Sequence, residues 1–265
     1  PGQDILSLVA MRAYLRAEAP VDLAVFNGDL ITANNVWANA TAYWDRAVSV
    51  CEEMGVPWAS TFGNHDDMPL EGPGGAPHLP QALTSREQLM ANDMAHALSL
   101  SVAGPAGVTG VSNYVLQVFG AGPVPTQLLF MDSGGGSMRS EVTPSQVAWL
   151  ERVRRGSGAP AVAFMHIPPV IFAGGAWAWG AAGGCFGAAN DSIAHHQADH
   201  GISEALVGPW GVEALLVGHN HGNDWCCPLR GTHFCYSRHA GYGGYGDPSW
   251  GPKGARVVEI REEPW

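Results

Sequence analysis

Positive charge is scarce in this sequence. Lysine and arginine together number 13 against 24 aspartate and glutamate residues, which gives a formal net charge of −11 at pH 7. A chain with this charge repels nucleic acid and anionic lipid surfaces, so we expect no nucleic-acid partner. The deficit does not exclude a phosphorylated small molecule as substrate, because bound metal cations reverse the sign of a local site.

Long apolar runs are also lacking. One stretch without charged residues extends from Val170 to Ala189, which is about the length of a membrane-spanning helix. It is rich in glycine and poor in leucine, isoleucine and valine, so its hydropathy is too low for such a helix. We therefore predict a glycine- and tryptophan-rich loop there and no membrane span.

Cysteine is sparse and unevenly distributed. Cys51 stands alone, and the other four cysteines lie in the last third of the chain: Cys185, Cys226, Cys227 and Cys235. Their spacing is not that of a zinc finger. Four cysteines are enough for two disulfide bonds, in which the adjacent Cys226 and Cys227 would more easily take different partners.

Disulfide bonds form in oxidising compartments. Two N-glycosylation sequons, which begin at Asn39 and Asn190, agree with such an environment. We therefore predict that the protein is secreted, vacuolar or in another secretory-pathway compartment.

The size and composition are those of a globular chain. It has 265 residues, of which 46% are hydrophobic and 14% are charged, and it is long enough for one large core. No internal repeat or linker divides it, so we predict a single domain over residues 1–265. Because the sequence begins at Pro1, we expect a processed form or a fragment of a longer protein, incomplete at its N-terminal end.

Apolar periodicity predicts helices alternating with short strands. Helical spacing covers residues 4–18, 38–54, 85–100, 143–155 and 196–206. Strand-like runs cover residues 21–26, 57–62, 112–119, 127–131, 161–165, 213–217, 232–237 and 255–260. This alternation predicts an α/β layered fold with its functional site at the strand ends.

Ligand-type side chains follow four of these strands: Asp29, Asn64 with His65, His166, and His219 with His221. In an extended chain alternate residues point the same way, so His219 and His221 can face one cavity. Converging imidazoles favour zinc, iron or manganese over calcium or magnesium. Taken by itself, however, the Gly-His-Asn-His motif fits a turn with two solvated histidines equally well.

The four strand ends together are typical of a two-metal hydrolase. Cations about 3.5–4 Å apart can bind both the substrate and the attacking hydroxide in an in-line displacement. In such a site a carboxylate bridges the two ions, an amide oxygen adds a neutral ligand, and imidazoles fill the remaining positions.

These residues resemble the motifs of the calcineurin-like metallophosphoesterases. The matching segments are, in order, Gly28-Asp29, Gly63-Asn64-His65-Asp66, His166 and Gly218-His219-Asn220-His221. Residues 28–35, 225–227 and 237–246 further resemble the small, non-purple relatives of purple acid phosphatases in plants, fungi and algae. The likeness covers about residues 21–260 and implies a four-layer sandwich of two packed mixed β-sheets flanked by helices.

The resemblance implies a role for each motif residue. Asp29 would bridge two metal ions, whose identity (Fe, Zn or Mn) stays open. Asn64, His166 and His219 would complete one metal site, and His221 would belong to the other.

The chemistry implied is attack of a metal-bound hydroxide on the phosphorus of a phosphomonoester. His65 would be the general acid that protonates the leaving alcohol. Asp66 would orient an imidazole, although a solvated loop carboxylate explains it at least as well.

Two features depart from the family pattern. The family's first strand ends in an Asp-x-His motif that supplies ligands of the second metal site, whereas here no histidine precedes His65. We therefore expect the first strand to be missing from this chain and the second site to be incomplete in it. Purple enzymes also carry a tyrosine ligand three residues after the bridging aspartate. Thr32 stands at that position, so we expect no purple colour.

Three residues beyond the last motif are candidates for substrate contact. Arg238 can clamp a phosphate through paired hydrogen bonds, with a surface ion pair as the alternative. His239 stands next to it, and Tyr242 belongs to a glycine- and tyrosine-rich run for which turn packing is the alternative.

We predict a phosphomonoesterase from these features. A catalytically impaired homologue, used as a structural or assembly subunit with a protein partner, is the alternative that the absent first motif favours. A phosphodiesterase uses the same ligands and is a third possibility.

Overall fold

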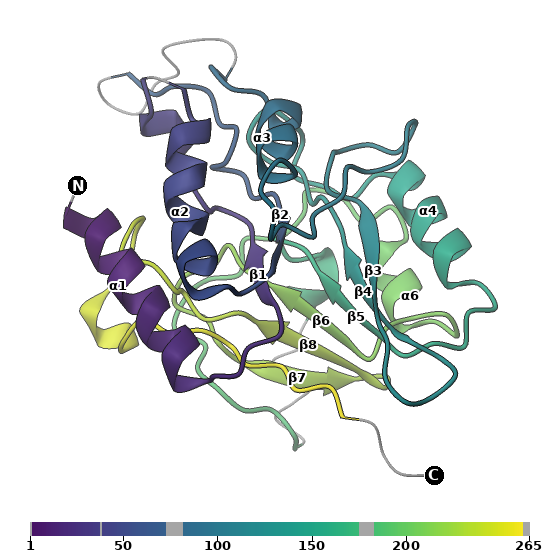
Figure 1. The fold of residues 1–265 in the computed structure, drawn as a ribbon. Coiled ribbons are helices and arrows are strands. Elements are labelled where there is room, and N and C mark those ends of the chain that lie inside the picture. The colour runs from purple at the N-terminus through teal and green to yellow at the C-terminus, as the bar shows by residue number, and fades with distance from the viewer. Residues whose placement is uncertain (1, 38, 73–81, 175–182, 262–265) are drawn as a thin grey trace.

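The computed structural model describes residues 2–37, 39–72, 82–174 and 183–261, and its elements form four layers (Figure 1). The first layer contains helices α1 (Gly2–Ala17), α2 (Thr41–Met54) and α3 (Arg86–Asp93). The second is a parallel pair of strands, β1 (Ala24–Asn27) and β2 (Trp58–Thr61). The third is a six-stranded sheet, and the fourth contains α4 (Pro144–Arg154) and α6 (Ile202–Val207).

The large sheet has the strand order β3-β4-β5-β6-β8-β7. Its members are β3 (Tyr114–Val118), β4 (Thr126–Phe130), β5 (Ala161–Phe164), β6 (Ala214–Val217), β7 (Cys226–Leu229) and β8 (Thr232–Tyr236). Strands β4, β5, β6 and β8 run parallel, and β3 and β7 pair antiparallel at the two edges. The predicted α/β sandwich of two sheets flanked by helices is thus confirmed, except that the smaller described sheet is purely parallel.

Two apolar cores hold the layers together, because side chains of a strand point alternately to its two faces. On β4, Leu128 and Phe130 belong to the core shared with β1, β2 and α2. Leu129 and the following Met131 belong to the core beneath α4 and α6. Strands β4, β5 and β6 are therefore buried on both faces, which explains their mostly apolar sequences.

The prediction of a strand near the C-terminal end was wrong. Residues 255–260 form no strand, and Val257 and Ile260 are exposed. The reason lies in the sheet order: β8 has β6 on one side and β7 on the other, so no position beside it is open. Strand β7 itself was not predicted, because it is short and contains Pro228.

Two predicted helices are shorter than expected. The segment predicted over residues 85–100 ends at Asp93, and the one predicted over 196–206 begins only at Ile202. Gly201 precedes that start in a left-handed conformation (φ 95°), and its N–H donates to the Asp199 carboxylate.

Within the described residues, no helix is both long and apolar enough to span a membrane. Residues 175–182 of the predicted glycine- and tryptophan-rich loop lie outside the described residues.

The four clustered cysteines form two disulfide bonds, Cys185–Cys227 and Cys226–Cys235, and Cys51 is buried and unpaired. The prediction that the adjacent cysteines take different partners is confirmed. The first bond ties residues 183–196, which we call the strap, to β7. Two isolated bridges, Phe186 with Cys226 and Ala189 with Asn223, hold the strap along the same segment.

Candidate metal centre

The ends of β1, β5 and β6 bring three ligand-type side chains together. Asp29, His166 and His219 each offer a donor atom, and these atoms all lie within 4.8 Å of one another. Nε2 of His166 is 2.9 Å from Oδ2 of Asp29, and the rings of His166 and His219 meet edge to face at 5.2 Å. A carboxylate and two imidazoles in this arrangement can hold a transition-metal ion.

Glycine makes this close approach possible. A Cβ atom on Gly28, whose φ is +83°, would lie 2.6 Å from the His166 ring. A Cβ atom on Gly63 would lie 2.2 Å from Oδ1 of Asp29. Asp29 and His219 themselves have positive φ values of 52° and 71°. Such strained backbone at non-glycine residues is frequent at functional sites.

The left-handed conformation of His219 corrects one expectation. β6 ends at Val217, so a tight turn and not alternation along an extended strand brings His219 and His221 to the wall of one cavity, and His221 lies outside the group formed by Asp29, His166 and His219. Asn220 between them is buried, and its Oδ1 accepts a hydrogen bond from the Tyr236 hydroxyl at 2.7 Å.

Backbone carbonyls set the orientation of two imidazoles. Nδ1 of His166 lies 2.9 Å from the carbonyl of Asn27, and Nδ1 of His221 lies 2.7 Å from the carbonyl of Tyr245. Each Nδ1–H therefore donates to a carbonyl, which leaves Nε2 as the ligand atom. The His221 ring also lies between two others, Tyr245 and His239, each with its centroid 4.0 Å away.

Burial and neighbouring charges shift the pKa values of these groups. Burial lowers the pKa of His219 to about 4 and also lowers the pKa of His221, so both rings are neutral near pH 7, as metal ligands must be. Burial alone would raise the pKa of Asp29 and lower that of His166. Their mutual attraction outweighs burial, so the pKa of Asp29 is lowered and that of His166 is raised.

Two buried polar atoms here make no hydrogen bond of good geometry, although one of them, Nε2 of His166, lies 2.9 Å from Oδ2 of Asp29. Oδ1 of Asn64 and Nε2 of His166 are inaccessible to solvent, and neither makes a hydrogen bond of good geometry. An unsatisfied buried polar group costs about 1–3 kcal/mol, and each such group calls for an explanation. A bound cation supplies one, because an amide oxygen and an imidazole nitrogen are both metal ligands. The residues present therefore fit the metal that the site implies.

His65 lies beside this group. Its backbone N–H donates to Oδ1 of Asp29 at 2.7 Å, and its ring Nδ1 is 3.1 Å from Oδ1 of Asn34. The amide oxygen of Asn34 can only accept, so Nδ1 of His65 carries the proton and Nε2 faces away from Asn34. His65, Asp29, His219 and His221 line one open cavity of about 290 Å³.

Asp66 has a different role from the one expected. Its carboxylate accepts hydrogen bonds from the backbone N–H groups of Gly63 (2.7 Å), Asp29 (2.9 Å) and Ile31 (3.0 Å). It therefore fixes the loop after β1 against the loop after β2 and orients backbone, not an imidazole. Burial and then the nearby Asp29 carboxylate raise the pKa of Asp66 to about 7.

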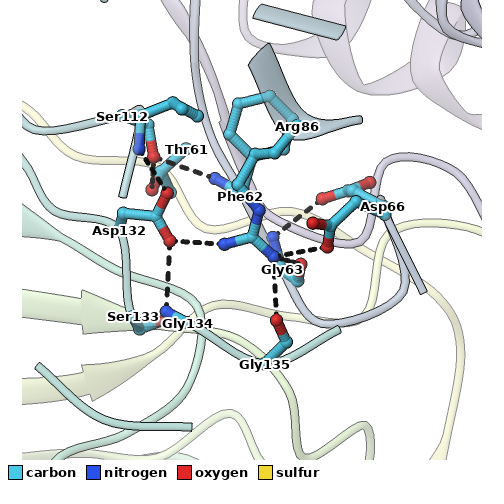
Figure 2. A network of polar contacts seen from close by, with 12 residues as sticks. Thr61, Phe62, Gly63, Asp66, Arg86, Ser112, Asp132, Ser133, Gly134 and Gly135 are labelled. Carbon is cyan, nitrogen blue, oxygen red and sulfur yellow. Dashed lines mark hydrogen bonds and ion pairs between the residues drawn. The ribbon is translucent and has the colours of Figure 1, made fainter. Parts of the chain in front are cut away.

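Arg86, the first residue of α3, joins the loop after β2 to the loop after β4. Its guanidinium donates to the carboxylates of Asp132 (2.5 Å) and Asp67 (2.6 Å) and to the carbonyls of Gly63 (3.0 Å) and Gly135 (3.1 Å). Figure 2 shows the guanidinium between Asp132, Gly63 and Gly135. The side chain of Arg86 is only 2% exposed, so this network is a buried support for the segment that carries Asn64.

The candidates for substrate contact lie outside the cavity wall. Arg238 pairs with Asp224 and also donates to the carbonyls of Trp250 and Pro252. The ring of His239 contacts that of His221 at an interplanar angle of 39°, and its Nδ1 is 2.7 Å from Nζ of Lys253.

Tyr242 is 40% exposed, and its backbone N–H donates to the Ser7 hydroxyl of α1. The structure thus places Arg238 and Tyr242 in the support of the C-terminal segment and brings only His239 into contact with a predicted ligand.

Sequence reasoning overlooked Arg86 and Asp191. A cation in the first turn of a helix opposes the helix dipole, and that unusual position was the available signal for Arg86. Asp191 lines the cavity, but its sequence context indicated only a glycosylation sequon.

A four-layer α/β sandwich with a carboxylate and imidazoles gathered at its strand ends is typical of metal-dependent hydrolases. The family model described as calcineurin-like phosphoesterase matches residues 3–223, and the chain belongs to that family.

Two curated relatives are from Arabidopsis thaliana. The chain is 29% identical to "Probable inactive purple acid phosphatase 28", over 95% of this chain and 66% of the relative. It is 27% identical to "Probable inactive purple acid phosphatase 14", over 98% of this chain and 68% of the relative. The chain thus spans about two thirds of the length of these relatives.

A solved structure shares the fold. It is a dimetal phosphatase from Danio rerio, which superposes with a TM-score of 0.57 at 15% identity and covers 90% of this chain and 78% of that one. At this identity the likeness shows the fold alone.

Proposed function

We propose that this chain is a metal-dependent phosphoesterase that hydrolyses small phosphomonoesters. The observation that carries the proposal is the convergence of Asp29, His166 and His219, with donor atoms within 4.8 Å, at a cavity that His65 also lines. The unsatisfied Oδ1 of Asn64 supports the presence of a metal ligand set.

Asn64, His166 and His219 would hold one ion (Fe, Zn or Mn), Asp29 would bridge it to a second, and His221 would bind the second. When bound, such ions supply Lewis acidity and lower the pKa of a coordinated water. The residues of this chain position the phosphate and move one proton. In its imidazolium form, with both ring nitrogens protonated, His65 would donate the Nε2 proton to the oxygen of the departing alcohol, while Nδ1–H stays hydrogen-bonded to Asn34 and holds the ring.

A second candidate function is a structural or assembly subunit with a protein partner. The names of the two Arabidopsis thaliana relatives favour it, because they call those proteins probably inactive. A phosphodiesterase is the third candidate, since the ligand set is shared.

The proposal also includes the cellular compartment in which the protein acts. The two disulfide bonds and the exposed Asn39 and Asn190 support a secreted or vacuolar glycoprotein. The net charge of −11 supports a small phosphorylated substrate over nucleic acid.

The test combines metal analysis with turnover. The purified chain, reconstituted with Zn²⁺ or Mn²⁺, is assayed against 4-nitrophenyl phosphate and bis(4-nitrophenyl) phosphate, and bound metal is counted by mass spectrometry. We expect bound metal and faster turnover of the monoester. Metal-loaded protein without turnover would favour the subunit, and faster diester turnover would favour the phosphodiesterase.

His65→Ala is the decisive variant. It should lower kcat by about 10²–10⁴-fold, the usual contribution of an acid–base group, while metal stays bound. His233→Ala, which removes an exposed imidazole from β8, is the matched control. It should change neither kcat nor the amount of bound metal. Loss of metal in His65→Ala would show that the residue is a ligand and not an acid. Asp29→Asn should lose both metal and activity.

A further inference from the structure

A second carboxylate lines the cavity that holds the metal ligands. Asp191 lies on the strap, and the strap is fixed to β7 by the Cys185–Cys227 bond. The backbone N–H of Asn190 donates to the carbonyl of Gly222, directly after His221. Asp191 is therefore carried to the cavity wall by a segment that no metal motif includes.

The side chain of Asp191 is held in one orientation. Its Oδ2 accepts hydrogen bonds from the Tyr245 hydroxyl (2.5 Å) and the Gly222 N–H (3.4 Å), and its backbone N–H donates to Oδ1 of Asn223 (3.0 Å). A Cβ on Gly222 would lie 2.9 Å from Cβ of Asp191, so the two segments are in close contact. Within the described residues, Oδ1 of Asp191 accepts no hydrogen bond, and no lysine, arginine or histidine pairs with the carboxylate.

The cavity wall therefore carries two carboxylates of different kinds. Asp29 lies beside His166 in the candidate metal group, where bound metal cations would compensate its negative charge. Asp191 belongs to no such group. Within the described residues, no lysine or arginine side chain lines this cavity. Asp191 is therefore a carboxylate of the cavity wall that neither lysine nor arginine compensates.

We propose that Asp191 selects substrates by the charge of their leaving group, and that it favours phosphomonoesters of small amino alcohols. An ammonium group on the alcohol would donate to Oδ1 of Asp191, a charge-assisted hydrogen bond. A carboxylate or second phosphate at the same place meets like charge. A cavity of about 290 Å³ suits a leaving group of a few heavy atoms.

The inference rests on the proposed phosphomonoesterase activity. In that reaction the oxygen of water bonds to phosphorus and releases a proton to solvent, the ester P–O bond breaks, and the alcohol leaves with the proton from His65, which solvent then replaces. Asp191 takes no part in these bond changes. It is a specificity-determining residue that contacts only the distal end of the alcohol.

Three substrates of nearly equal size separate charge from shape. They are 2-aminoethyl phosphate, 2-hydroxyethyl phosphate and phosphoglycolate, which end in an ammonium, a hydroxyl and a carboxylate. The metal-loaded wild type should show kcat/KM values that fall in this order, with about 10–100-fold between the first and the last. Asp191→Asn should reduce that ratio at least about tenfold and change the hydroxyl substrate less than about threefold.

Glu151→Gln is the matched control, because it removes one exposed negative charge from α4, away from the cavity. It should leave the ratio of kcat/KM for 2-aminoethyl phosphate to kcat/KM for phosphoglycolate unchanged. The proposal is overturned if wild type prefers the hydroxyl or carboxylate substrate, or if Asp191→Asn slows all three substrates equally. Equal slowing would show that Asp191 only supports Tyr245 and His221.

Failure of the phosphomonoesterase proposal is recognised separately. If metal-loaded wild type turns over none of the three substrates, calorimetric titration with each compound still measures binding. Tighter binding of 2-aminoethyl phosphate that is lost in Asp191→Asn would support the role of Asp191 in a site without turnover. Equal binding by both proteins would overturn it.

Discussion

The two walls of the cavity are built in different ways. The wall that carries Asn64 and His65 depends on buried charge, because Arg86 is 2% exposed and its partners Asp67 and Asp132 are 0% exposed. The wall that carries His221 depends on ring stacking and backbone contacts, and the Tyr245 side chain there is 51% exposed.

This contrast separates two tasks. Buried ion pairs allow one geometry only, since breaking them leaves a charge in an apolar interior. They suit a wall that must hold a ligand and a proton donor in place. The more exposed wall bears the strap and Asp191, and it suits contact with the variable part of a substrate.

The variant with the largest expected effect on this difference between the walls is Arg86→Met. The variant keeps an apolar stem over Phe62 but leaves Asp67 and Asp132 buried without a counter-charge. We expect the free energy of unfolding to fall by about 3–5 kcal/mol, measured by urea denaturation.

The control for that variant is Arg139→Met. Arg139 also pairs with a carboxylate, Glu141, but its side chain is 74% exposed, so the loss should be below about 1 kcal/mol. Equal losses in the two variants would contradict the claim that buried charge supports this wall.

Acid should weaken the second wall through His196, a buried residue at the end of the strap. Burial lowers its pKa from 6.5 to about 4, so it is neutral in the fold while the unfolded chain takes up a proton below about pH 6.5. Protonation then favours the unfolded state. The free energy of unfolding should fall by about 2–3 kcal/mol from this group as the pH drops from 6.5 to 4.5.

The measurement is urea unfolding at both pH values for wild type and His196→Leu. The variant should lose stability less steeply on acidification, because it lacks the titrating ring. His195→Leu, which alters the exposed neighbour, serves as control. An identical pH dependence in wild type and His196→Leu would show that His196 is not kept neutral by the fold.

The smallest expected effect belongs to Tyr245→Phe. This variant keeps the ring on His221 and the carbonyl that accepts from it, and removes only the hydroxyl that contacts Asp191 and the His221 N–H. Stability should fall by about 1 kcal/mol, and metal affinity should stay within about threefold of wild type. A loss as large as that of Arg86→Met would remove the distinction between the walls.

Local patterns predicted most of the fold and the positions of the motif residues. An apolar run followed by glycine and a polar side chain is readable in sequence, as at Asp29 and His219, because strand and turn are formed by the same few residues. The left-handed backbone of His219 was not foreseen, because strand alternation suggested an extended chain there.

Long-range features could not be read in this way. Arg86 is separated by 46 residues from its partner Asp132, and Asp191 by 54 residues from Tyr245. Nothing near either residue indicates these partners. Likewise, residues 255–260 have a strand-like composition, but the place beside β8 is taken by β7.

The Cys185–Cys227 bond closes a covalent loop that contains β6 and both histidines of the Gly-His-Asn-His motif, with a sequence separation of 42. A protease that cuts once between Cys185 and His219 would put Asp29 and His166 on one fragment and His219 and His221 on the other. The bond would still join the two fragments. The candidate metal centre would then come apart only after reduction, so a nicked protein is expected to keep its metal and release it when a thiol is added.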